Sequence, residues 1–136
     1  MRTRGRKSVA SLAVAVSPIE TTERPDAPYD LTDEQTQEWW AVVNRMPADW
    51  FPRETHGMLS QYCRHVVAAR RVAQLIAKAE KAKSLDVSDY DRLLKMQERE
   101  GRAISSLATR MRISQQATFD KERKKPKTVT KPWEAN

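Results

Sequence analysis

The sequence predicts an all-α protein: a short N-terminal helix, two long helices forming a hairpin, a short C-terminal helix and flexible basic tails. Three observations predict this fold. Apolar residues recur at three- and four-residue spacing from Leu31 to Met111, only 3 of the 136 residues are glycine, and the positive charge gathers at the chain ends. We expect one domain, with an N-terminal tail over 1–28, a helical core over 29–119 and a C-terminal tail over 120–136.

The first helix is expected over residues 33–45. Thr32 suits an N-cap, Asp33 favours the positive end of the helix dipole, and Gln35 completes a capping box. Pro47 ends the pattern because proline removes a backbone donor. The apolar residues at helical spacing are Trp39, Val43 and Met46, with Trp40 beside them.

The second helix is expected from Arg53 to Lys83, and Pro52, just before it, is well placed at a helix start. At 1.5 Å per residue it spans roughly 45 Å, longer than the roughly 35 Å diameter of a compact domain of this size. Either the third helix or neighbouring copies of the chain must therefore cover its apolar stripe. This stripe comprises Leu59, Tyr62, Val66, Ala69, Ala73 and Ile76, and the lysines that suit the negative end of the helix are Lys78, Lys81 and Lys83.

The third helix follows a turn over residues 84–88, with Ser88 expected as its N-cap. Gly101 indicates either close helix approach or a weak exposed position. Ser114 then suits the cap of a short last helix through about Lys124. The third helix's stripe comprises Tyr90, Leu94, Gln97, Gly101, Ile104, Ala108 and Met111. The residues expected in an oligomer seam between copies are Leu59, Tyr62, Val66, Ile76, Leu94 and Ile104.

The net charge of +7 is carried entirely by the two ends. Residues 1–7 carry +4 and residues 121–131 carry +5, which leaves −2 for the remainder. Two basic tails on one short chain favour a polyanion such as double-stranded DNA, because neutralising phosphates releases counterions. A membrane is disfavoured, because neither tail interleaves bulky apolar residues with its charges. The expected DNA contacts are Lys121, Arg123, Lys124, Lys125, Lys127 and Lys131, with Arg2, Arg4, Arg6 and Lys7 as an auxiliary set.

No residue pattern predicts catalysis, a metal site or a cofactor. The sequence has no phosphate-binding glycine loop. Cys63 and His65 point about 200° apart on a helix, and His56 lies roughly 10 Å from Cys63 along the axis. Cys63 is therefore interpreted as a small buried apolar residue. The acidic cluster Asp86, Asp89 and Asp91 surrounds a helix start, where acids favour the dipole.

The sequence favours a cytoplasmic protein. The apolar run Val9–Val16 is eight residues long, far below the roughly 20 that a bilayer span requires. It resembles the apolar part of a signal peptide, but its small-residue exit leads into Ser17 and Pro18. The single cysteine offers no disulfide framework of the kind common in small secreted proteins.

The order of these features resembles the small subunits of tailed-bacteriophage terminases, in the branch related to phage HK97. The resemblance covers about residues 24–119. It is carried by the segment Arg24 to Thr32 leading to Glu38-Trp39-Trp40, by Leu59 to Cys63, and by Met111 to Ser114 after a long helix. It implies a non-enzymatic DNA-packaging factor that assembles into a ring in the bacterial host cytoplasm. Such a factor recognises viral DNA and passes it to a large subunit with ATPase and nuclease activities.

Two other functions are compatible with a helical hairpin. One is an adaptor whose oligomeric seam binds another protein, with tails that serve solubility. The other is a dimeric helix-turn-helix transcription factor, which is disfavoured because no short glycine-containing turn joins two short helices. The nearest segment, Asp49 to Gly57, leads into a helix that is far too long.

Overall fold

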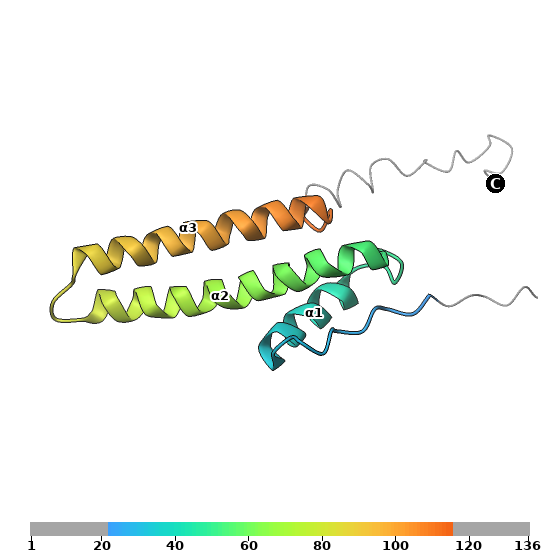
Figure 1. Ribbon diagram of the computed structural model, residues 1–136, viewed down its shortest axis with the longest axis horizontal. Coiled ribbons are helices and arrows are strands. Elements are labelled where there is room, and N and C mark those ends of the chain that lie inside the picture. Colours follow the sequence, from blue (N-terminus) through green and yellow to red (C-terminus); the bar gives the residue numbers. More distant parts are fainter. Residues whose placement is uncertain (1–21, 116–136) are drawn as a thin grey trace, which may run out of the picture.

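The computed structural model describes residues 22–115, which fold into helices without a strand. The elements are α1 (Asp33–Arg45), the 3-10 turn η2 (Arg53–Thr55), α2 (His56–Lys81) and α3 (Val87–Arg110). Helices α2 and α3 run side by side as a long antiparallel hairpin, and α1 lies against the first half of α2 on the side away from α3 (Figure 1). The predicted all-helical class and the hairpin are confirmed.

Helix α1 forms as its sequence predicts, with the same bounds. The Thr32 hydroxyl accepts a hydrogen bond from the Gln35 backbone N–H at 3.4 Å, and the Gln35 side chain accepts one from the Thr32 N–H at 3.1 Å. This capping box satisfies two backbone donors that the first helical turn leaves unpaired. The helix stops at Arg45, ahead of Pro47.

The core lies where α1, the start of α2 and the end of α3 meet. Trp39 is fully buried, and its indole N–H donates to the Pro25 carbonyl at 3.0 Å. Ala27 packs against the same cluster, so the packed part of the chain begins ahead of residue 29. The buried members of the cluster are Leu31, Trp39, Val43, Met46, Phe51, Leu59, Cys63 and Met111.

Helix α2 begins later and ends earlier than the sequence predicts. Pro52 is the N-cap of the 3-10 turn η2 and not the first residue of an α-helix. The Pro52 carbonyl accepts hydrogen bonds from both the backbone N–H and the hydroxyl of Thr55, at 2.9 and 2.8 Å, and these bonds tighten the chain into η2. The α-helix starts only at His56 and ends at Lys81.

The buried face of α2 also differs from the expected stripe. Val67 is buried with 1% of its surface exposed, whereas Val66 is only half-buried. Leu59, Cys63 and Val67 follow four-residue spacing, and Ile76 lies about half a turn away from Val67 around the axis. Because α2 packs between α1 and α3, it buries two opposite faces. The sequence analysis predicts only one apolar stripe on this helix.

The N-cap of α3 is Asp86, two residues ahead of the expected Ser88. The Asp86 carboxylate accepts from the backbone N–H groups of Ser88 and Asp89, at 2.9 and 3.4 Å. An ionised acceptor also interacts favourably with the helix dipole, which a serine hydroxyl does not.

Gly101 lies on α3 in open space. A Cβ added to this glycine would meet no neighbouring atom within 4 Å. Gly101 is therefore an exposed position and not a point of close helix approach within the chain.

The C-terminal end of α3 closes with a Schellman motif. Ile113 donates its N–H to the Ala108 carbonyl at 3.0 Å, and Arg112 donates to Thr109 at 3.1 Å. Arg112 adopts the left-handed conformation with φ of 57°, at the position where glycine is usual. The Trp50 indole N–H donates to the Met111 carbonyl at 3.0 Å, which ties the α1–α2 connector to this end of α3.

Candidate functional site

The second half of α2 lacks the cover that α1 gives to the first half. Two ion pairs lie where this cover ends: Arg64 with Asp30, and Arg70 with Glu38. Beyond them the hairpin continues as two helices alone (Figure 1). One face of α2 is therefore open to solvent from Arg71 onward.

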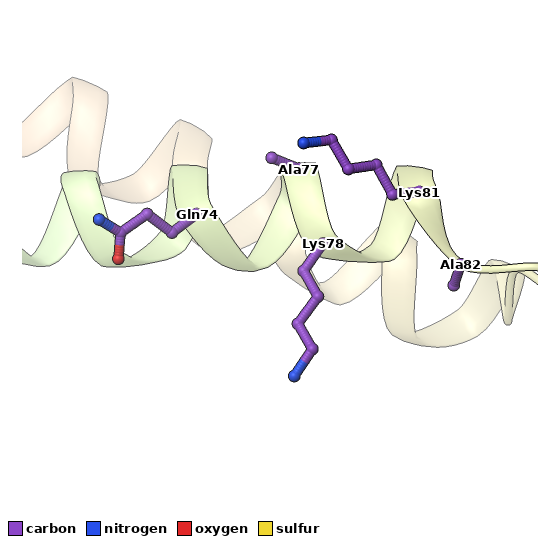
Figure 2. A pocket seen from close by; sticks show the side chains of 5 residues that line it. All are labelled: Gln74, Ala77, Lys78, Lys81 and Ala82. Atoms are coloured by element: carbon purple, nitrogen blue, oxygen red, sulfur yellow. The ribbon is translucent and has the colours of Figure 1, made fainter.

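Cationic side chains occupy this open face. The row that is buried as Leu59, Cys63 and Val67 continues at helical spacing into Arg71, Gln74, Lys78 and Lys81, all of them exposed. We call Arg71, Lys78 and Lys81 the cation row. Figure 2 shows Gln74, Lys78 and Lys81 around a shallow surface that also includes Ala77 and Ala82, with α3 behind α2. The two lysine side chains extend to opposite sides of this surface.

No carboxylate of the described residues pairs with the cation row. Glu80 is the one acidic residue in the sequence between Arg71 and Leu85. Its carboxylate accepts a hydrogen bond from the Tyr90 hydroxyl of α3 at 2.9 Å, which holds it on the α3 side of the helix and raises the pKa of Tyr90. The cation row therefore forms an unneutralised positive surface.

Three exposed cations on α3 have a different environment. Arg92 lies 3.3 Å from Asp89, Lys95 lies 2.7 Å from Asp91, and Arg102 pairs with Glu98. The hydrogen bond from Lys95 to Asp91 raises the pKa of that ammonium group. These pairs are local, at three- and four-residue spacing, and are typical of a solvated helix face. These three cations therefore differ from the cation row, whereas Arg99 and Arg110 of α3, also exposed, make no ion pair with a described residue.

The residues of the expected oligomer seam occupy different environments in the chain. Leu59 and Ile76 are covered by the chain itself, with 0% and 7% of their surface exposed. Tyr62, Val66 and Ile104 are half-buried. Leu94 is 39% exposed on α3, on the same stripe as the open Gly101. Only the α3 part of the seam therefore presents a large apolar side chain to solvent.

Cys63, His56 and His65 form three separate environments. Cys63 is fully buried, as predicted, and this burial, with the nearby Glu38 charge, raises the pKa of its thiol to about 12. His65 Nδ1 lies 2.5 Å from a Glu100 carboxylate oxygen and links α2 to α3. His56 lies 3.1 Å from the Phe51 carbonyl, and its ring is edge-on to Trp39 with the centroids 5.9 Å apart. The geometry brings no nucleophile and base together among these residues.

The acidic cluster at the start of α3 acts locally. Asp86 caps the helix, while Asp89 and Asp91 pair with cations on the same helix. Across residues 22–115, no group of three or more His, Cys, Asp or Glu side chains is placed to hold a metal ion. The capping interpretation of this cluster is confirmed for Asp86.

The basic residues predicted to contact DNA lie outside the described part of the chain, in 1–7 and 121–131. The expected short helix that follows Ser114 also lies outside it, beyond Gln115. The cation row is not predicted from the sequence, because the helix dipole already explains Lys78 and Lys81. The signal that could have found it is the spacing from Arg71 through Lys78 to Lys81 on a face without an acid.

Comparison with known protein families, with curated proteins and with solved structures finds no match to this chain. No helix in the described part of the chain is long and apolar enough to cross a membrane.

Proposed function

We propose that this protein is a non-enzymatic, oligomeric DNA-binding factor of the terminase small-subunit type. In this role it binds double-stranded viral DNA at the start of packaging in the bacterial cytoplasm. It then delivers the DNA to a large subunit that carries the ATPase and nuclease activities. The chain supplies binding surfaces and no chemistry.

One observation carries the DNA-binding part of this proposal: both basic tails join the folded part at the same end. The described chain begins at Thr22 and ends at Gln115, and both lie at the end of the hairpin opposite the α2–α3 turn (Figure 1). The segments 1–7 and 121–131 carry +4 and +5. Both charged segments therefore attach to the described chain at one end of the hairpin, and each phosphate that they contact would add salt-sensitive affinity.

The shape of the hairpin supports the oligomeric part. The half of the hairpin nearer the α2–α3 turn has no third helix against it (Figure 1). Its exposed apolar side chains include Leu85, Val87 and Leu94. Neighbouring copies can bury these side chains, which adds stability in proportion to the apolar area removed from water. The α3 stripe of Leu94 and Gly101 is the surface that we assign to this contact.

A gel-shift experiment on duplex DNA at two salt concentrations tests the proposal. The full chain should bind duplexes of any sequence, with an affinity that falls steeply between about 50 and 200 mM salt. Deletion of residues 121–136 should weaken binding and flatten the salt dependence without changing the number of copies in the assembly. Absence of duplex binding at the lower salt concentration would refute DNA binding.

The purified chain should hydrolyse neither ATP nor DNA with Mg²⁺, and nicking that disappears in Asp89→Ala would refute the non-enzymatic role.

A protein-binding adaptor is the second candidate, and the exposed apolar residues at the hairpin turn favour it. Leu85 is 47% and Val87 is 74% exposed, so apolar side chains at the turn are accessible to a second protein. An adaptor whose tails serve only solubility would show no duplex binding in the same gel shift. The experiment therefore separates the two functions.

A further inference from the structure

We infer that the cation row on α2 is a second, folded contact surface for the phosphate backbone of duplex DNA. This inference deepens the proposed function and rests on it. The surface comprises Arg71, Lys78 and Lys81, with Gln74 between Arg71 and Lys78 along α2. Figure 2 shows Gln74, Lys78 and Lys81. It lies in the second half of α2, toward the α2–α3 turn, whereas residues 22 and 115 lie at the opposite end of the hairpin.

The chemistry of the side chains changes along one helical row of α2. Under α1 the row is apolar and buried, as Leu59, Cys63 and Val67. Where α1 stops covering it, the row becomes cationic and exposed. A face that only needs to be solvated can use either sign of charge or neutral polar groups. Here its three charged members are all positive, and Gln74 is a neutral side chain that also donates hydrogen bonds.

Three exposed cations of α3 differ from the cation row, because each already has a carboxylate partner. Arg92, Lys95 and Arg102 on α3 each pair with a carboxylate three or four residues away. Among the described residues the cation row has no such partner, and Glu80 is held toward α3 by Tyr90. Unpaired cations remain available to an external anion, because binding it breaks no existing ion pair.

The length of the cation row suits the phosphate spacing of a duplex. Arg71 and Lys81 are ten residues apart, which is about 15 Å along the axis, and a duplex carries one charge per roughly 1.7 Å of its length. Several phosphates thus lie within reach of the cation row when α2 rests against the backbone. Arginine, lysine and glutamine side chains are common phosphate donors that position a protein without reading sequence. The contact should therefore be independent of DNA sequence.

The test compares two triple variants of the full chain that each remove three positive charges. The first is Arg71→Gln, Lys78→Gln and Lys81→Gln; the matched control is Arg92→Gln, Lys95→Gln and Arg102→Gln. Binding is measured on a fluorescent 30-base-pair duplex over a series of salt concentrations. We expect the first variant to lose about tenfold or more in affinity at 0.1 M salt and to lower the slope of log K against log salt by about 2 to 3. The control should bind like the unchanged chain.

Three results would overturn the inference while the proposed function stands. The first is an unchanged affinity and slope in the α2 variant, and the second is an equal loss in both variants, which indicates net charge alone. The third is an altered assembly mass of the α2 variant without DNA, which indicates a contact between copies. If the unchanged chain fails to bind the duplex, the proposed function fails and the inference fails with it.

Lysine acetylation of the unchanged chain gives a second readout that does not depend on the folding of a variant. Lys78 and Lys81 should be protected by the duplex, whereas Lys95 should react equally with and without DNA. Equal reaction of Lys78 and Lys81 in both conditions would also overturn the inference.

Discussion

Cys63 is enclosed between α1 and α2, where water does not reach its side chain. Burial raises the pKa of its thiol from the ordinary 9.0 to about 12, and the Glu38 charge acts in the same direction. The thiolate is the reactive form of cysteine, so the native protein should resist alkylation at neutral pH. Mass spectrometry after iodoacetamide treatment should find Cys63 unmodified in the native chain and modified in urea. Rapid modification of the native chain would contradict this burial.

The same shift links stability to pH. The folded state holds the thiol proton more tightly than the unfolded state, so its contribution is complete below about pH 9 and is lost as the pH rises toward 12. The expected loss is at most about 1.4 kcal/mol per pH unit. Thermal melts of Cys63→Ala against the unchanged chain at pH 8 and pH 10 isolate this contribution. An equal change in melting temperature for both proteins would contradict it.

Arg112 holds a conformation that favours glycine, at the C-terminal end of α3. Arg112→Gly should stabilise the protein by about 0.5–1 kcal/mol, because the left-handed conformation is disfavoured for side chains with a Cβ. Arg110→Gly is the matched control and should destabilise the protein by about 1 kcal/mol, since it places glycine inside the last helical turn. Urea unfolding of the two variants measures both effects. A loss of stability in both would show that the Schellman motif does not form.

At the scale of the element, the cap of α3 distinguishes the structure from the sequence-based expectation. Asp86→Ala should cost about 1 kcal/mol, because two backbone N–H groups lose their acceptor. Ser88→Ala, at the position where the sequence predicts the cap, should be close to neutral. Urea unfolding of both variants compares them directly. A larger effect of Ser88→Ala would place the cap where the sequence pattern does.

The elements whose signals are local could be predicted from the sequence, and those that depend on partners could not. Thr32, Gln35 and Pro47 define α1 within a few residues of its ends, and its predicted bounds are confirmed. The buried face of α2 depends on two partners on opposite sides, so the single-stripe pattern predicts Val66 where Val67 is buried. The helix dipole alone explains lysines near the C-terminal end of α2. The cation row is therefore not predicted from the sequence.

At the scale of the whole molecule, the hairpin carries different surfaces at its two ends. One end holds the core and the junctions of both basic tails, and the other carries the cation row and exposed apolar side chains. A ring of such chains would repeat every charged surface around its axis. Several copies would then contact one duplex together, which multiplies the number of phosphates bound and steepens the salt dependence.

Leu94 provides a specific test of how copies would meet. Leu94→Asp should reduce the assembly mass while the chain stays helical, since Leu94 is already 39% exposed. Met96→Asp is the matched control, because Met96 is 45% exposed and points about 200° away from Leu94 on the same helix. Light scattering at equal protein concentration measures the mass. An equal effect of both substitutions would remove Leu94 from the seam.

The central claim is that this chain acts as an assembly of several copies that binds duplex DNA. Native mass spectrometry of the full chain, alone and mixed with a 30-base-pair duplex, tests it most directly. We predict one defined oligomer without DNA and the same oligomer carrying the duplex when DNA is added. A clean monomer that remains free of DNA would contradict the claim.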